Sequence, residues 1–176
     1  MHPATKPNPN QSDAVLEVNN SAHEKLYLHP GQLFASRQSH AVTTILGSCV
    51  AVCLWDPLAK IAGVNHFLLP SIPASSTKDA RYGNTAMQRL VDDIVSRGAS
   101  KNRLMAKIFG GANVILAFAP KKPIGTQNVG IAREVLGKNG IEIVAEETDG
   151  RRGPEAALRH RHRRGADQGG WDDRRC

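Results

Sequence analysis

Cys49 and His66 are the residues of this 176-residue chain whose types and surroundings best fit covalent chemistry. Cys49 directly follows Gly47-Ser48, where one apolar run stops and the next begins. Backbone N–H groups at such a turn can converge on one point, as an oxyanion hole requires. His66 lies 17 residues further along the chain. An imidazole beside a thiol can take its proton, so the two residues are a candidate nucleophile and base.

The elements expected around this pair place the two side chains on neighbouring strands. Residues 49–55 form an unbroken apolar run, which is typical of a strand buried on both faces. Residues 61–69 are expected to return as the second strand of a hairpin that turns at Pro57-Leu58. In that register residues 49 and 66 face each other. From the pattern alone, a buried thiol and a structural histidine remain the alternative.

The remaining periodicity predicts strands before this hairpin and alternating helices and strands after it. Apolar residues at helical spacing predict a helix that starts at Gly83 or Asn84 and ends at Gly98. A second amphipathic helix is expected over 127–138. The other expected strands are 25–28, 32–36, 41–46, 103–109 and 141–145. The sequence therefore predicts an α/β (α+β) domain in which helices pack on a mixed β-sheet.

Composition excludes several classes of protein. Lys and Arg number 23 against 16 Asp and Glu, a net charge of +7, and 40% of the residues are hydrophobic. No apolar run approaches the roughly 20 residues that span a bilayer, and residues 1–22 lack the pattern of a secretory signal. Three cysteines without a regular spacing are typical of a reducing compartment. We therefore expect a cytoplasmic protein, neither a transmembrane receptor nor a secreted disulfide-rich one.

Cys53 is a useful comparison for Cys49, because it lies four residues further along the same expected strand. Its Cα atom would lie about 13 Å from that of Cys49, too far for a disulfide between them. Cys53 is therefore expected to be a core residue. The two cysteines also lack the C-x2-C spacing of a zinc site, and no metal or cofactor is expected.

Both ends of the chain are expected to be disordered around a domain that spans 23–153. Residues 1–22 are rich in Pro, Asn and Ser and have little apolar surface to bury. Residues 154–176 are basic, and their Arg and His cluster at 159–164. No aromatic residue is interleaved with this cluster, which favours a solvated tail over a nucleic-acid site.

The segment after residue 153 is not expected to form a strand. Pro154 opposes ladder pairing, and apolar residues are scarce beyond Leu158. A shift of the reading frame near residues 152–154 would explain such an end.

Several runs of this chain match, in order, the motifs of one known family. They are Leu46–Leu54, Asp56-Pro57, Asn65–Phe67, Leu69-Pro70, Arg81–Gly83 and Lys107–Asn113. Through them, residues 25–153 resemble the CheD chemoreceptor glutamine deamidases. The match includes Cys49, His66 and the interval between them, so the resemblance implies that both residues are catalytic.

The resemblance implies a three-residue site in which Cys49 is the nucleophile and His66 the general base. The family's threonine lies six positions before the cysteine, which is Thr43 here, and a slip of one residue would give Thr44 instead. Its hydroxyl would fix the tautomer of the imidazole. The N–H groups of Ser48 and Cys49 would hold the oxyanion.

The implied reaction is hydrolysis of a protein glutamine side chain to glutamate, with release of ammonia, through a thioester on the cysteine. The substrates would be the cytoplasmic domains of methyl-accepting chemotaxis proteins, and the CheC phosphatase is a further partner of some family members. A non-catalytic CheD-like module that binds receptors or CheC is the alternative function. Neither nucleic-acid binding nor membrane insertion is implied.

The glycine-containing run at 109–113 has two interpretations. Within the resemblance, the surface that meets the receptor would include Phe109, Gly110, Gly111, Ala112 and Asn113. The alternative is a tight turn in which glycine supplies a positive φ. The run lacks both G-x-G-x-x-G and a following Gly-Lys-Ser/Thr, so no nucleotide site is expected.

Overall fold

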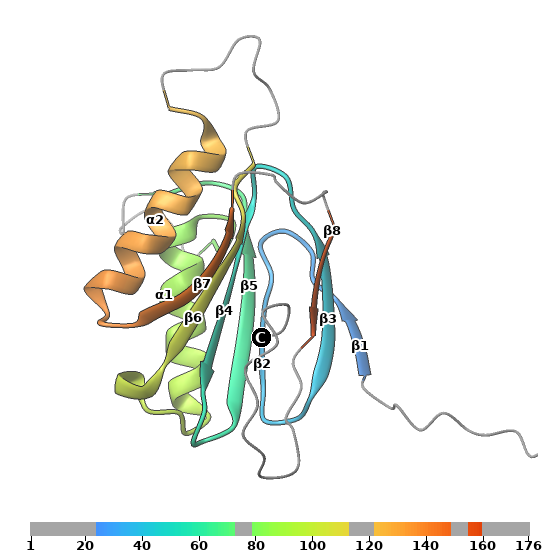
Figure 1. Ribbon diagram of the computed structural model, residues 1–176, viewed down its shortest axis with the longest axis vertical. Helices are drawn as coiled ribbons and strands as arrows, with labels where there is room; N and C mark the ends of the chain where they lie inside the picture. The colour runs from blue at the N-terminus through green and yellow to red at the C-terminus, as the bar shows by residue number, and fades with distance from the viewer. Residues whose placement is uncertain (1–23, 73–78, 113–121, 149–154, 160–176) are drawn as a thin grey trace, which may run out of the picture.

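Two β-sheets face each other in the computed structural model, and two helices cover the outer face of the larger sheet (Figure 1). The structure describes residues 24–72, 79–112, 122–148 and 155–159. Its strands are β1 (Glu24–Tyr27), β2 (Leu33–Ser36), β3 (His40–Ile45), β4 (Val50–Asp56), β5 (Ile61–Phe67), β6 (Met105–Gly110), β7 (Glu142–Thr148) and β8 (Glu155–Arg159). The helices are α1 (Gly83–Ser96), the short 3-10 helix η1 (Lys101–Arg103) and α2 (Ile124–Lys138). The predicted fold class, a mixed sheet with helices packed on it, is confirmed.

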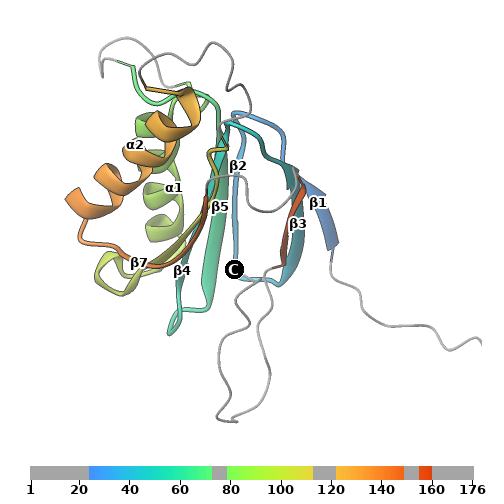
Figure 2. The ribbon, with the colours of Figure 1, turned by 45° about the horizontal axis from the view of Figure 1, so that its top comes forward.

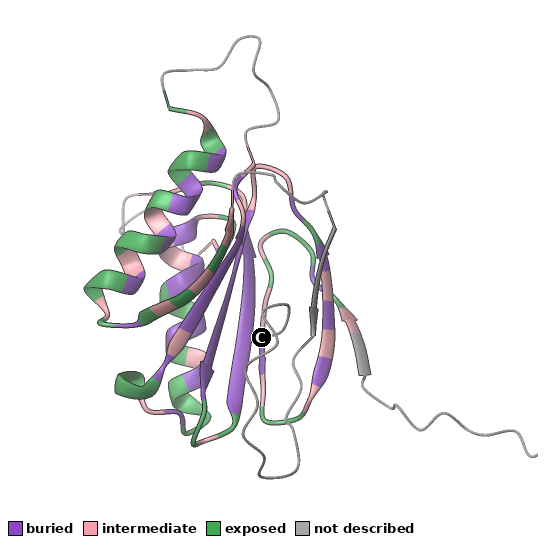
Figure 3. Ribbon diagram, viewed as in Figure 1, coloured by how far each residue is buried: buried purple, intermediate pink, exposed green. Residues whose placement is uncertain are grey.

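The larger sheet has the strand order β2-β5-β4-β6-β7, and the smaller one has the order β1-β3-β8. All seven residues of β4 and all seven of β5 are buried. Figure 2 and the burial colouring of Figure 3 show the reason, since these central strands have the helices on one side and the smaller sheet on the other. The apolar run that predicted a strand buried on both faces is thereby explained.

The two faces of the larger sheet belong to two separate apolar clusters. Alternate residues of β4, such as Val52 and Leu54, pack with the helices, and the intervening Ala51 and Cys53 pack toward the smaller sheet. Side chains of a strand alternate between its faces, so a residue's parity decides which cluster it joins. The same parity places His66, the ladder partner of Ala51, on the face toward the smaller sheet.

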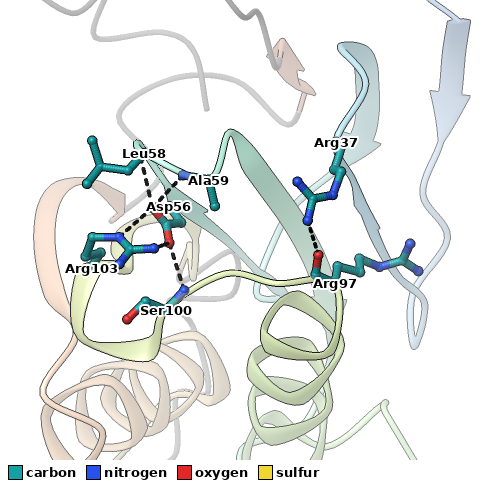
Figure 4. Close-up of polar contacts among 7 residues, drawn as sticks. All are labelled: Arg37, Asp56, Leu58, Ala59, Arg97, Ser100 and Arg103. Carbon is teal, nitrogen blue, oxygen red and sulfur yellow. Dashed lines mark hydrogen bonds and ion pairs between the residues drawn. The ribbon is translucent and has the colours of Figure 1, made fainter.

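Helix α1 begins and ends close to its predicted bounds. Gly83, its first residue, lies so near β5 that a Cβ there would be 2.7 Å from the Phe67 ring. Gly98 follows the helix with φ +106°, a conformation that favours glycine. Arg37 donates a hydrogen bond to the Arg97 carbonyl, which ties the helix end to the β2–β3 connection (Figure 4). Helix α2 begins at Ile124, three residues before the predicted start.

The hairpin register differs from the predicted one by two residues. His66 pairs with Ala51 rather than with Cys49, and Asp56 pairs with Ile61. The connection has four residues instead of two and contains Lys60 at φ 54°. The longer turn moves the pairing along the ladder. A shift of two preserves the face of every side chain, so Cys49 still lies on the face that carries His66.

Strand β8 lies in the segment for which no strand was expected. It pairs antiparallel with β3, with Thr43 opposite Ala157 and Ile45 opposite Glu155. That expectation was therefore wrong for 155–159. The expectations for 1–22 and 160–176 fall outside the described residues.

No helix in the described part of the chain is long and apolar enough to cross a membrane.

Asp56 joins the β4–β5 turn to the connection between α1 and β6 (Figure 4). Its carboxylate accepts hydrogen bonds from the N–H groups of Leu58 (2.9 Å), Ala59 (3.0 Å) and Ser100 (2.8 Å). Arg103 adds two more, from Nε at 3.1 Å and from a terminal nitrogen at 2.7 Å. Burial alone would raise the pKa of Asp56, but the Arg103 guanidinium and the three N–H groups hold that pKa well below its usual range.

Replacing this carboxylate should destabilise the fold in a pH-dependent way. Asp56→Ala should lower the free energy of unfolding by about 3 kcal/mol at pH 7, because several buried donors lose their acceptor. A carboxyl whose folded pKa is depressed stabilises the fold above its unfolded pKa of about 3.9, and that contribution is lost as pH falls through the folded pKa. The free energies of unfolding of the two proteins, measured with urea, should therefore approach each other as pH falls below about 4.

The matched control is Asp92→Asn, since Asp92 is exposed on α1. It should change the free energy of unfolding by no more than about 0.5 kcal/mol. If the free energies of unfolding of Asp56→Ala and the unmodified protein differ by the same amount from pH 7 to pH 3, the ionised Asp56 carboxylate is not the source of the stabilisation.

Candidate active site

His66 is fixed in position by backbone and side-chain hydrogen bonds. Its side chain is 1% exposed and faces the smaller sheet. The His66 N–H donates to the Gln32 carbonyl at 3.0 Å, and its carbonyl accepts from the Gly31 N–H at 2.7 Å. Oγ1 of Thr44 lies 2.8 Å from Nδ1 of the ring.

The Thr44 hydroxyl decides which ring nitrogen of His66 carries the proton. Its single proton is donated to the Leu28 carbonyl at 2.7 Å, because a carbonyl can only accept. Toward His66 the hydroxyl must then accept, so Nδ1 carries the hydrogen. The other nitrogen, Nε2, is left with its lone pair, which is the form that can act as a base.

Nε2 of His66 is buried and has no hydrogen-bond partner among the described residues. Burial lowers the pKa of His66, and nearby His29 lowers it further, against an opposing effect of the Leu28 carbonyl. The ring is therefore neutral at neutral pH and its Nε2 is free to accept a proton.

Cys49 belongs to the cluster on the face of the larger sheet that carries Ala51 and His66. It precedes β4 by one residue, and Ala51, two residues on, is the partner of His66 in the ladder. Such diagonal neighbours have Cα atoms about 7–8 Å apart, within reach of longer side chains. The structure shows no hydrogen bond between Cys49 and Nε2. Contacts of this kind often tighten only when substrate binds.

The thiol of Cys49 is free and half-buried. Burial raises the pKa of the Cys49 thiol, with a smaller opposing effect of its own backbone N–H. At rest the site therefore pairs a neutral thiol with a neutral imidazole. Both shifts favour the uncharged forms, so the thiol would have to lose its proton before or during any attack by its sulfur.

The hydrogen bond to His66 comes from Thr44 and not from Thr43, the residue preferred from the family spacing. Thr44 is fully buried, whereas Thr43 is half-buried and points to the other face of β3. Adjacent strand residues point to opposite faces, so an error of one position exchanges the side chain at the site. Thr43 contributes its carbonyl, which accepts from the Leu28 N–H at 2.9 Å.

The loop that carries Cys49 has three successive carbonyls held by donors from elsewhere in the fold. These bonds run from the Ala112 N–H to Gly47 (2.8 Å), from the Asn128 amide to Ser48 (2.9 Å) and from the Gly111 N–H to Cys49 (2.8 Å). In a trans peptide the N–H points opposite to the C=O. The N–H groups of Ser48 and Cys49, the predicted oxyanion donors, are therefore directed away from these anchors.

The run that begins at Phe109 has a structural role in this anchoring. The Phe109 side chain is buried between the sheets and offers no surface to a partner. Gly110 and Gly111 have φ of +94° and +72°, as the tight-turn interpretation requires. A Cβ on Gly110 would lie 2.3 Å from the Cys49 carbonyl oxygen. Receptor contact by this run stays a prediction, and Asn113 falls outside the described residues.

Asn128 is a residue of this site that was not predicted from the sequence. It is fully buried on α2 and donates to the carbonyls of Ser48 (2.9 Å) and Leu68 (2.7 Å). A signal was present, because Asn128 shares the apolar helix face with Ala132 and Leu136 at intervals of four residues. A polar residue in such a stripe needs a buried partner.

Cys53 is fully buried in the apolar cluster between the two sheets, as expected of a core residue. The predicted absence of a Cys49–Cys53 bridge is confirmed, since Cys49 is free. Within the described ranges, no group of three His, Cys, Asp or Glu side chains is arranged to hold a metal ion.

Comparison with known proteins gives one consistent family. The family model described as CheD chemotactic sensory transduction matches residues 68–161. A protein of Anaeromyxobacter dehalogenans is 43% identical over 129 residues, covering 73% of this chain and 75% of its own. A protein of Stenotrophomonas maltophilia is 43% identical over 142 residues, covering 80% and 71%. Both are named probable chemoreceptor glutamine deamidases. This chain belongs to the CheD family.

Membership of the CheD family confirms the resemblance read from the motifs. The family-model match begins at Leu68, after Cys49 and His66, and includes Asn128 and β8. Likeness to solved structures is weaker. The crystal structure of Bacillus licheniformis hypothetical protein YfiH covers 72% of this chain and 63% of its own, with a TM-score of 0.45 and 10% identity.

The position of the threonine can be tested without an activity assay. In the unmodified protein, nitrogen NMR should show His66 as the tautomer protonated at Nδ1. Thr44→Val keeps the shape of the side chain but removes the acceptor for the Nδ1 hydrogen. His66 should then no longer prefer this tautomer. Thr43→Val is the matched control and should leave the His66 spectrum unchanged. The reverse pattern would return the role to Thr43.

Proposed function

We propose that this CheD protein hydrolyses glutamine side chains of chemoreceptor cytoplasmic domains to glutamate, releasing ammonia, with Cys49 as the nucleophile. The relatives' names support the substrate and the reaction. The observation that carries the chemical assignment is the hydrogen bond between Thr44 and Nδ1 of His66, which leaves Nε2 as a free base on the Cys49 face. No metal or cofactor takes part in the proposed reaction.

In the first half of the reaction, Nε2 of His66 takes the proton of the Cys49 thiol as the sulfur attacks the carboxamide carbon. The carbonyl double bond opens and its electron pair moves onto oxygen. The N–H groups of Ser48 and Cys49 would donate to this oxyanion. The imidazolium then gives its proton to the departing nitrogen, ammonia leaves, and a thioester remains on Cys49.

In the second half, a water molecule gives a proton to Nε2 of His66 while its oxygen attacks the thioester carbon. Collapse of the second tetrahedral intermediate breaks the carbon–sulfur bond, and the sulfur takes the proton back from the imidazolium. The product is a glutamate side chain, so one neutral receptor residue becomes an anion. Thr44 acts as a positioning residue, and its neutral hydroxyl stabilises the imidazolium less than a carboxylate would.

Ammonia release from a purified receptor cytoplasmic fragment is the direct test of this proposal. The unmodified protein should release ammonia, and Cys49→Ala and His66→Ala should each lower kcat by at least about 1000-fold. Cys53→Ala, on the same strand, is the matched control and should retain activity per mole of folded protein. Activity that survives Cys49→Ala would end the nucleophile assignment.

Binding of the receptor fragment or of CheC by a folded protein that releases no ammonia would instead identify the non-catalytic module. Co-sedimentation with the fragment separates that outcome from simple loss of folding.

The pH dependence of Cys49 should reflect a neutral resting pair. Iodoacetamide should alkylate Cys49 with a midpoint above the ordinary thiol value of about 8.5, because burial raises the pKa of this thiol. Deamidation should persist below pH 6.5, the ordinary pKa of histidine, because burial lowers the pKa of His66. At still lower pH the ring becomes protonated and kcat/KM should fall. An alkylation midpoint well below 8.5 would instead reveal a preformed thiolate–imidazolium pair.

A further inference from the structure

The open end of the β4–β5 hairpin is closed by one side chain from α2. The paired ladder ends at Val50 and Phe67, and Ser48 and Leu68 lie just beyond it. The amide nitrogen of Asn128 donates to both of their carbonyls, at 2.9 Å and 2.7 Å. An asparagine amide has two protons, so both are committed to this contact.

The arrangement leaves the other end of the same amide without a partner. Oδ1 of Asn128 is buried and accepts no hydrogen bond in the described part of the molecule. A buried unpaired carbonyl destabilises a fold, and a buried polar atom left in this state calls for a reason. An apolar side chain would avoid that cost but would leave the carbonyls of Ser48 and Leu68 unpaired. The two donated bonds are the feature that only the amide supplies.

These two bonds act on both members of the catalytic pair. The Ser48 C=O and the Cys49 N–H belong to one planar peptide unit, so holding the carbonyl aims the N–H. Leu68 follows His66 by two residues and lies directly after the last residue of β5. Asn128 therefore fixes the direction of one expected oxyanion donor and also holds the two sides of the site at a set spacing.

Close backbone packing brings α2 near enough for this contact. A Cβ on Gly125 would lie 2.4 Å from the Gly111 carbonyl oxygen, and a Cβ on Gly111 would lie 2.3 Å from the Val129 side chain. The same Gly111 donates its N–H to the Cys49 carbonyl at 2.8 Å. Helix α2 and the segment after β6 thus hold the Cys49 loop together.

We propose that Asn128 is a positioning residue for the deamidation, whose amide aligns the Cys49 N–H with the developing oxyanion. The inference rests on the proposed function and adds a residue of α2 to it. Misalignment of an oxyanion donor affects the transition state of amide hydrolysis. It does not affect alkylation of the thiol, which passes through no oxyanion.

The test compares kcat, KM and Cys49 alkylation in Asn128→Leu, which keeps a similar volume without donors. We expect kcat to fall about 10- to 100-fold with KM changed by less than about threefold. The rate of alkylation by iodoacetamide should stay within about threefold of the unmodified protein. Asn128→Ser, which restores one donor, should recover part of kcat and serves as the main variant if Asn128→Leu does not fold.

Asn84→Leu is the matched control, because Asn84 also joins a helix to a loop through two hydrogen bonds, both with Ile72. It should lower stability without changing kcat. The inference is overturned if a folded Asn128 variant keeps full kcat. It is also overturned if kcat and alkylation fall together as stability falls. A wild-type protein that releases no ammonia would instead refute the proposed function, and this inference with it.

Discussion

The Cys49 loop depends on donors that come from outside its own hairpin. Cys49 precedes the first ladder residue of β4, so strand pairing alone would leave the backbone at the proposed nucleophile unrestrained. Three carbonyls are instead held from the segment after β6 and from α2. That anchoring requires backbone to approach backbone, which explains the positive φ and the absent side chains at Gly110 and Gly111. A larger residue at either position would clash with its neighbours and shift the loop that carries Cys49.

The site avoids charge at rest because it lies between two packed sheets. The burial that raises the pKa of the Cys49 thiol also lowers the pKa of His66, so both groups stay neutral. A hydroxyl as third partner fits this setting, because a carboxylate in place of Thr44 would place an unpaired charge in a fully buried position. The hydroxyl still selects the tautomer, since its only O–H donates a hydrogen bond to the Leu28 carbonyl. Charge would appear only transiently, when sulfur attacks and the proton moves.

The local pattern of apolar residues predicted most of the strands and helices around the site. The predictions that failed depend on contacts between residues far apart in the sequence. The apolar run of β4 predicted a central strand, and parity kept Cys49 and His66 on one face even though the register was two residues off. Turn length set that register, and the sequence of Pro57–Lys60 does not distinguish a two-residue from a four-residue connection. Whether Thr43 or Thr44 faces His66 depends on how β3 aligns with Leu28, which lies 16 residues before Thr44 and accepts its hydrogen bond. Strand β8 likewise depends on pairing with β3, far back in the chain.

Asn128, which was not predicted, has hydrogen-bond partners that a single sequence does not identify. Asn128 stands in an apolar helix stripe, and only the packed structure shows that its partners are the carbonyls of Ser48 and Leu68, 80 and 60 residues away. Buried polar atoms without partners are costly and therefore rare. In the described part of the chain, Nε2 of His66 and Oδ1 of Asn128 are two such atoms, and both belong to residues that flank the Cys49 loop. The unpaired Nε2 of His66 is what the proposed mechanism requires, because a ring nitrogen already engaged in a hydrogen bond could not accept the thiol proton.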